Sequence, residues 1–293
     1  MRIFLTGATG FIGSAVVPEL INAGHQVLGL TRSDSGAVSL KTAGAEVHRG
    51  DLEDLKSLRS GAAKSDGVIH TAFIHDFTKF KENCEIDKRA IETLGDALDG
   101  SNRSLIVTSG IGALAPGRVA TEEMEVVLNQ AMPRVSEQAG LALIARGVSV
   151  SVVRLPQVHN PVKQGLITYM IQMAREKGVS AYVGNGSNRW AAAHVLDVAH
   201  LYRLALERRE SGAKYHAVGE EGVSMREIAE AIGRGLKIPV ASLSPEDAAA
   251  HFGWLAFFAA LDMPASSALT QQRLGWRPTG PGLIADLDQM RYF

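Results

Sequence analysis

Glycines at a regular spacing follow the first apolar segment of the chain. Residues 3–5 (Ile-Phe-Leu) lead into Thr-Gly-Ala-Thr-Gly-Phe-Ile-Gly at residues 6–13, and apolar residues then recur at helical spacing. Between a strand and a helix, such glycines allow the tight turn, the approach of a phosphate and the packing of helix on strand. The first amides of the helix would face the phosphates. The predicted pyrophosphate site consists of Gly7, Thr9, Gly10, Phe11, Ile12 and Gly13.

The end of the second predicted strand, residues 26–30, indicates which dinucleotide this site prefers. An acidic side chain at that point would accept the ribose 2′-hydroxyl of NAD, but the chain continues with Thr31, Arg32 and Ser33. The planar guanidinium of Arg32 suits a 2′-phosphate, and the Ser33 hydroxyl could add a bond. The other interpretation of Arg32 is a solvated side chain. The pattern favours NADP, with NAD as the second choice.

The third predicted strand, residues 45–48, ends close to Asp51 and Leu52. Both residues could flank the adenine ring, and the Asp51 carboxylate could bond the adenine amine. Alternatively, Asp51 is the N-cap of the helix that contains Leu55. The sequence alone leaves both interpretations open.

The elements that must hold these residues alternate along the first half of the chain. Further short apolar strands are predicted at residues 67–71, 104–109 and 149–155, with long helical stretches at 79–98 and 121–146. Repeated strand–helix units with nearly continuous apolar strands predict a doubly wound parallel sheet, an α/β fold of the Rossmann type. We therefore expect a dinucleotide-binding domain at residues 1–160.

After Pro156 the pattern changes to helical stretches at residues 164–177, 196–207 and 225–236, with short strands between them. This change predicts a smaller C-terminal lobe at residues 161–293 that binds the substrate, while residues 190–220 contribute to the first domain. In that lobe Phe252, Trp254, Phe257 and Phe258 form an aromatic cluster. Helical spacing favours a core role for the cluster over the wall of an apolar pocket.

Several further segments carry a family resemblance. Residues 6–13, 50–52, 68–72, 106–109, 153–156 and 183–199 occur in the order typical of extended short-chain dehydrogenase/reductases. The chain thus resembles the NAD(P)-dependent epimerase/dehydratase group over nearly its whole length. The resemblance implies that His70, Thr71 and Ala72 run beside the cofactor, that Ser109 is the active-site serine, and that Pro156 and Val158 lie near the nicotinamide.

One part of the family pattern is missing. The family carries a catalytic tyrosine and, four residues later, a lysine that lowers the tyrosine pKa. An ungapped count places these positions at Leu128 and Met132, and no tyrosine or lysine occurs between Ser109 and Arg154. The chain therefore resembles the atypical members of the family.

Two residues are candidates for the missing proton chemistry. Ser109 could bond a substrate carbonyl, although a hydroxyl alone is a poor acid and an ordinary strand-end role is the alternative. His159 follows the sixth strand and, as an imidazole, could exchange a proton near neutral pH. A structural histidine is the other interpretation.

Composition excludes other classes of protein. The net charge of −1 gives no basic surface for nucleic acid. The longest apolar run, residues 254–261, is too short to cross a membrane. A single cysteine excludes a disulfide framework, and the histidines lack a metal-ligand spacing. The N-terminal apolar segment is too short for a signal peptide, so we expect a cytoplasmic location and no bound metal.

These observations lead to three hypotheses of function. The first is an NAD(P)-dependent oxidoreductase that acts by hydride transfer on a small carbonyl or hydroxyl compound with an atypical catalytic site. The second is a non-catalytic NADP(H)-binding protein with a redox-sensing or regulatory role. The third is a nucleotide-sugar epimerase or dehydratase. The expected partner is a small-molecule substrate, and two subunits could pair as a homodimer through helices near residues 82–98 and 126–145.

Overall fold

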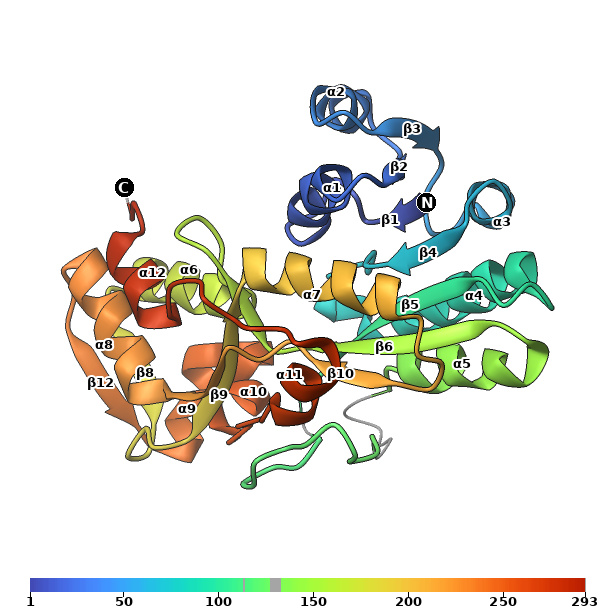
Figure 1. Cartoon of the computed structure of the whole chain (residues 1–293). Coiled ribbons are helices and arrows are strands. Elements are labelled where there is room, and N and C mark those ends of the chain that lie inside the picture. The colour runs from blue at the N-terminus through green and yellow to red at the C-terminus, as the bar shows by residue number, and fades with distance from the viewer. Residues whose placement is uncertain (113, 127–132, 293) are drawn as a thin grey trace.

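A parallel sheet with helices on both faces forms the larger part of the molecule (Figure 1). The computed structural model describes residues 1–112, 114–126 and 133–292, and in this part of the chain the sheet has seven strands in the order β10-β6-β5-β4-β1-β2-β3. All neighbours in it pair in parallel. The strands are β1 (Arg2–Thr6), β2 (Gln26–Thr31), β3 (Glu46–Arg49), β4 (Gly67–His70), β5 (Ser104–Gly110), β6 (Ser149–Leu155) and β10 (Lys214–His216). The predicted doubly wound α/β fold is confirmed.

Alternating side chains divide the buried residues of the sheet between two faces. In β1, Ile3 and Leu5 pack with helices α1 (Gly13–Asn22) and α7 (Val195–Arg208). Phe4 points the other way, toward α3 (Leu55–Ala63) and α4 (Phe80–Leu98). The helix α2 (Asp34–Thr42) adds Leu40 to the first of these two cores. This division matters because it determines which polar residues at the strand ends share a face.

The second lobe has its own apolar core. It contains the sheet β11-β9-β7 and the pair β12-β8, and Figure 1 shows most of its helices gathered at one end of the molecule. Its strands are β7 (Gln157–His159), β8 (Ser180–Val183), β9 (Arg189–His194), β11 (Glu220–Ser224) and β12 (Val240–Leu243). Its helices are α6 (Ile167–Lys177), α8 (Met225–Leu236), α9 (Pro245–Phe252), α10 (Ala256–Ala260) and α12 (Leu283–Gln289), with a 3-10 turn η3 (Gly253–Leu255).

The helix predicted over residues 121–146 is wrong over the first part of the described length. Helix α5 covers only Ser136–Ala142, the 3-10 turn η2 follows at Leu143–Arg146, and residues 121–126 are not helical. The buried guanidinium of Arg154 donates to the carbonyl oxygens of Glu122 and Met124, which a helix would use for its own bonds. Within residues 126–145, expected at a homodimer contact, the described helical segments are α5 and η2, which begin at Ser136. Leu128 and Met132 lie outside the described residues.

Across the described ranges, no helix combines the length and the apolar character that crossing a membrane requires.

Candidate functional site

The glycine turn has the geometry that the sequence predicts. Gly7 has a φ of 69°, and a Cβ on it would lie 2.8 Å from the Ala72 nitrogen. The Gly10 amide donates to the Gly7 carbonyl oxygen at 2.8 Å. A Cβ on Gly13 would lie only 2.1 Å from that same oxygen. Glycine is therefore required at residues 7 and 13, because the turn, the helix α1 and the loop after β4 approach one another so closely.

Two unpaired backbone amides occur at the start of α1 in the described part of the chain. Within the described residues, the backbone amides of Phe11 and Ile12 have no hydrogen-bond acceptor, and no side chain caps the helix at Ile12. The first turn also lacks an acidic residue. The Lys163 ammonium lies 5.8 Å from the centroid of the Phe11 ring and adds positive charge. Donors and positive charge at a helix N-terminus fit a pyrophosphate. Lys163 was not predicted, because it comes from a distant loop.

The nucleotide end of the site lies between β2 and β3. Arg32 is exposed and, in the described part of the chain, its side chain makes no hydrogen bond or ion pair. The Ser33 hydroxyl caps α2 by accepting from the Gly36 amide at 3.0 Å. Thr31 pairs with Arg49 across the two strands, so a second guanidinium, ion-paired with Asp34, stands beside the same site. The sequence analysis missed Arg49.

Asp51 does not cap a helix. Its carboxylate accepts from the amides of Glu53 and Asp54, while Asp54 is the N-cap of α3 and accepts from the Ser57 amide. The N-cap interpretation of Asp51 is therefore wrong, because the helix begins three residues later. Leu52 is buried in the core beside α3 and α4. The adenine contact of Asp51 and Leu52 stays a prediction.

A chain of buried polar groups crosses the carboxyl ends of the strands on the α4 face. The Thr6 hydroxyl lies 2.8 Å from His70 Nδ1, and His70 Nε2 lies 3.1 Å from Asp87 Oδ1 on α4. The hydroxyl of Ser136, at the start of α5, donates to the other Asp87 oxygen. Burial by itself would raise the pKa of Asp87, but the bond from His70 and the charge of Arg134 outweigh it, so the pKa lies below its ordinary value. Asp87 is therefore a buried carboxylate that holds three elements together.

Ser109 shares this face with Thr6 and His70. The neighbouring Thr108 side chain points to the opposite face, where its hydroxyl lies 2.6 Å from that of Tyr202 on α7. Since side chains alternate along a strand, Ser109 points toward α4 and α5. Its side chain is mostly buried. The Thr71 hydroxyl donates to the Thr6 carbonyl oxygen at 2.8 Å, and Thr71 and Ala72 lie against the glycine turn.

Arg134 lies at the same edge of the sheet. Its Nη2 donates to the Thr108 carbonyl oxygen at 3.1 Å, and its Nε donates to Ser136 Oγ at 2.7 Å. The guanidinium carbon lies 4.2 Å from the centroid of the Phe73 ring, and Nε is 3.8 Å from Asp87. Sequence analysis missed Arg134 because a helix was expected there.

His75 follows β4 at the surface of this region. Loss of water around the ring lowers the His75 pKa, and the positive charges of Arg134 and Lys163 lower it further. These two charges come from different segments of the chain, and both act on His75. The Asp87 carboxylate acts on His75 in the opposite direction, and the two cations near this edge of the sheet suit an anionic ligand.

His159 lies in the interior of the protein. The ring is fully buried in β7, and Nδ1 lies 2.6 Å from Asp286 Oδ2 on α12. The opposite nitrogen, Nε2, has no hydrogen-bond partner among the described residues and lies 3.9 Å from Glu220. Burial lowers the His159 pKa, although Asp286 acts in the opposite direction. The geometry shows a contact between β7 and α12, and proton exchange by His159 stays a prediction.

The other two residues expected near the nicotinamide follow β6. Pro156 is partly buried, and Val158 is buried in the core that contains α7. Their contact with a nicotinamide also stays a prediction.

Aromatic rings connect the two lobes beside this edge. Phe77, from the loop after β4, stacks on Trp254 of η3 with 4.5 Å between centroids and 12° between planes. Tyr169 of α6 meets the same Trp254 ring edge-on at 5.2 Å. Phe77 also lies 5.7 Å from Phe80. The contact therefore joins the loop after β4 to the second lobe.

The aromatic cluster predicted in the second lobe is divided between two environments. Phe252 belongs to the core, as helical spacing favours. Trp254 and Phe257 retain 42% and 46% of their surface exposed. These exposed aromatic side chains, next to the stack of Phe77 on Trp254, form an apolar patch on the surface.

Replacing Phe77 by alanine should expose Trp254. The other two tryptophans, Trp190 and Trp276, are fully buried, so the change in emission comes from Trp254. We expect a red shift and stronger quenching by acrylamide, because one face of the indole becomes open to water. Phe257→Ala is the control, since the Phe257 ring meets that of Phe258 edge-on, 5.4 Å between centroids, rather than stacking on Trp254. An unchanged emission spectrum in Phe77→Ala would contradict the stack.

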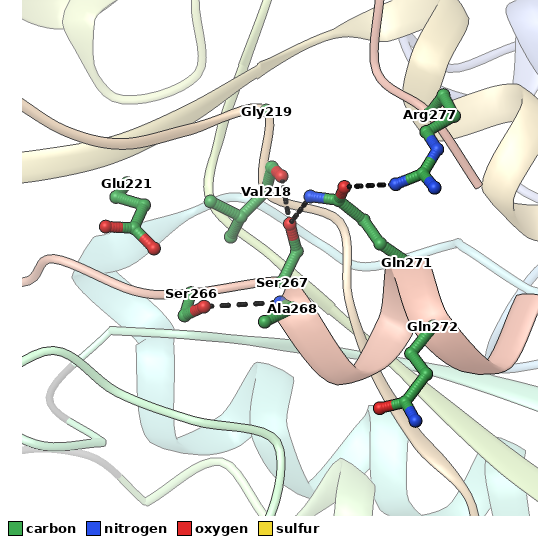
Figure 2. Close-up of a pocket in the computed structure, with 9 residues that line it drawn as sticks. All are labelled: Val218, Gly219, Glu221, Ser266, Ser267, Ala268, Gln271, Gln272 and Arg277. Carbon is green, nitrogen blue, oxygen red and sulfur yellow. Dashed lines mark hydrogen bonds between the residues drawn. The ribbon is translucent and has the colours of Figure 1, made fainter. Parts of the chain in front are cut away.

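A separate hollow of about 440 Å³ lies on the outer side of the protein, near the ends of β10 and α11 (Ala268–Leu274) (Figure 2). Its polar side chains largely satisfy one another. Ser267 Oγ donates to the Val218 carbonyl oxygen, Gln271 donates to Ser267 Oγ, and Arg277 donates to Gln271. None of the residues predicted to bind a cofactor lines it, so we place the candidate site at the glycine turn. Residues 1–112, 114–126 and 133–292 contain no cluster of metal-ligating side chains.

Comparison with known proteins agrees with this geometry. A family model described as NAD(P)H-binding matches residues 7–195. An uncharacterized protein of Schizosaccharomyces pombe is 48% identical, with all of both chains covered. An uncharacterized protein of Saccharomyces cerevisiae is 45% identical over 98% of each chain. The structure of MoeE5 with UDP-glucose and NAD has a TM-score of 0.76 and 23% identity, covering 99% of this chain and 97% of the other.

A more distant relative has a named activity. The 2-alkyl-3-oxoalkanoate reductase of Stenotrophomonas maltophilia is 26% identical, with 78% of this chain and 73% of the relative covered. The matched family model covers the glycine turn, the strand ends and Ser109, and it extends to the start of α7. The chain belongs to the NAD(P)H-binding family.

Proposed function

We propose that the protein is an NADP(H)-dependent oxidoreductase that transfers hydride between the nicotinamide and a small carbonyl or hydroxyl compound. The observation that carries this proposal is the pair of unbonded amides at Phe11 and Ile12, beside a turn that only glycine can form. A dinucleotide pyrophosphate would accept from these amides. A bound nicotinamide would supply or receive the hydride, and the polar edge formed by Ser109 and Arg134 would hold the substrate oxygen.

Named relatives include both a carbonyl reductase and a UDP-glucose 4-epimerase, each 26% identical to this chain, so the choice between the two chemistries depends on the residues of the site. The 2-alkyl-3-oxoalkanoate reductase acts, by its name, on a ketone. Epimerases and dehydratases of the resembled family rely on the tyrosine that residues 110–153 lack. The same absence favours a second candidate, a non-catalytic NADP(H)-binding protein with a regulatory role.

One experiment separates the two candidates. Isothermal titration calorimetry with NADPH and NADH measures cofactor binding, and a panel of aldehydes, ketones and quinones then measures NADPH oxidation. Binding with turnover supports the oxidoreductase, whereas binding without turnover supports the regulatory protein. Failure to bind either coenzyme, oxidised or reduced, would contradict both.

Arg32 is predicted to select NADPH. Arg32→Ala should weaken NADPH binding about 10- to 100-fold, since a charge-assisted bond to phosphate contributes roughly 1.5–3 kcal/mol. NADH binding should change less than about threefold, because NADH lacks the 2′-phosphate. Calorimetry measures both dissociation constants. Arg208→Ala is the matched control, because Arg208 is an exposed cation at the far end of α7. Equal losses for the two cofactors would contradict the assignment.

A further inference from the structure

In the described part of the segment that lacks tyrosine and lysine, one cation reaches the sheet edge. Residues 110–153 contain three arginines, at positions 118, 134 and 146. Arg118 lies in an exposed loop, and Arg146 pairs with Asp96 and Asp99 at the opposite end of α4. Among the described residues, Arg134 is the arginine of this segment that bonds to β5, at the carbonyl of Thr108.

The surroundings of Arg134 fix its guanidinium in place. Ser136 on α5, Thr108 on β5 and Phe73 after β4 contact it from three different elements. The two hydrogen bonds engage two of the five N–H donors of an arginine. The side chain keeps 23% of its surface exposed, so a small molecule can reach it from the solvent side. A cation fixed before the substrate arrives needs little reorganisation during a reaction.

The nearest carboxylate does not neutralise Arg134 completely. Asp87 already accepts hydrogen bonds from His70 and Ser136, and its closest approach to the guanidinium is 3.8 Å. Burial is the largest cause of the lowered His75 pKa, and the charge of Arg134 lowers that pKa further. This edge of the sheet is therefore arranged to receive negative charge on an oxygen atom.

We propose that Arg134 binds the substrate oxygen and stabilises the negative charge that it gains, and that the substrate is a carbonyl compound with a planar, apolar body. Phe73 packs against the guanidinium, and Phe77, farther along the same chain segment, stacks on Trp254, so aromatic rings line this side of the site and suit such a body. This inference rests on the proposed oxidoreductase function. A reduced nicotinamide would supply hydride to the carbonyl carbon, the C=O electron pair would move to oxygen beside Arg134, and water would supply the proton.

The alternative is that Arg134 only fastens the chain before α5 to the sheet. Binding of benzoate, which joins a planar ring to an anionic oxygen, separates the two roles without turnover. Calorimetry should show that benzoate binds the complex of the wild-type protein with NADP⁺. Arg134→Met should raise the benzoate dissociation constant about 10- to 100-fold, and Arg134→Lys should recover most of that loss. Arg118→Met is the matched control.

Three outcomes overturn the proposal. They are an absence of benzoate binding to the wild-type complex, unchanged binding in Arg134→Met, or an equal loss in Arg134→Met and Arg134→Lys. NADPH binding to all variants should stay within about threefold, because Arg134 is placed beside the substrate rather than the pyrophosphate. Failure of the wild-type protein to bind NADPH would instead refute the proposed function.

A measurement on the wild-type protein covers the case in which Arg134→Met does not fold. NMR titration of His75 in the NADP⁺ complex, with and without benzoate, should show a higher pKa when benzoate is bound, because the anion offsets the charge of Arg134. An unchanged His75 titration at saturating benzoate would overturn the proposal.

With benzaldehyde as substrate, Arg134→Met should lower kcat by about 10²–10³-fold, as loss of an oxyanion donor does.

Discussion

Replacing Arg154 by methionine should lower the free energy of unfolding by about 3–5 kcal/mol, the usual cost of breaking a buried ion pair. Arg154 is fully buried and donates to both Glu137 oxygens, at 2.8 and 2.6 Å. It also donates to the carbonyls of Glu122 and Met124. Methionine fills the space but leaves the buried Glu137 carboxylate without this partner.

His216 adds to the expected loss of unfolding free energy. Burial lowers its pKa to about 4, so the ring is neutral at pH 7. Its Nδ1 donates to the Ser266 carbonyl oxygen at 2.8 Å, and its Nε2, 3.2 Å from the guanidinium, then accepts from Arg154. Removing the arginine therefore leaves a second buried polar atom without a donor, which carries its own cost.

Urea denaturation at pH 7 measures the loss. The double variant Arg154→Met/Glu137→Leu should recover part of the stability, because it removes the stranded charge together with its partner. The control is Arg234→Met, which breaks an exposed pair with Asp288 and should cost less than about 1 kcal/mol. A loss in Arg154→Met no larger than in this control would contradict the role of the buried pair.

The sheet and the glycine turn could be predicted because both depend on local sequence. Short apolar runs that alternate with segments of helical periodicity indicate alternating strands and helices, the pattern of a parallel sheet. Gly13 is needed for a contact within the first strand–helix unit, and Gly7 has a φ of 69° in the turn of that unit, so their spacing carries the information. Arg32 could be proposed for the same reason, because it directly follows β2.

The contacts among the polar residues at the strand ends could not be predicted, because these residues come together only in the folded sheet. His70 and Asp87 are seventeen residues apart and meet because α4 returns across β4. Lys163 reaches Phe11 from the loop after β7. Apolar spacing over residues 121–146 suggested a helix, but tertiary bonds from Arg154 to the backbone outweighed that local preference. Because this helix prediction was wrong, Arg134 was not recognised as part of the site.

Replacing Gly13 by alanine should abolish cofactor binding, with a loss of at least about 100-fold in NADPH affinity. The new Cβ would lie 2.1 Å from the Gly7 carbonyl oxygen, which is backbone and cannot rotate away. Helix α1 must then move away from the turn, and the amides of Phe11 and Ile12 move with it. Such overpacking also costs about 1–3 kcal/mol of folding free energy, which urea denaturation will register.

Substitutions at two other glycines distinguish a loss of NADPH binding caused by a changed turn from one caused by a less stable fold. Gly24→Ala places a side chain at a φ of 84° with no atom within 4 Å, so it should destabilise the fold by about 1 kcal/mol and leave NADPH binding unchanged. Gly10→Ala meets only the Gly7 oxygen, at 3.1 Å. Its Cβ therefore tests whether phosphate approaches the backbone at Gly10, because the shift that the Gly7 oxygen must make is much smaller than for Gly13→Ala. Calorimetry should rank NADPH affinity as Gly24→Ala above Gly10→Ala above Gly13→Ala.

If Gly13→Ala bound NADPH as tightly as Gly24→Ala, the pyrophosphate would have to bind elsewhere, and the function proposed from the unbonded amides would fail with it.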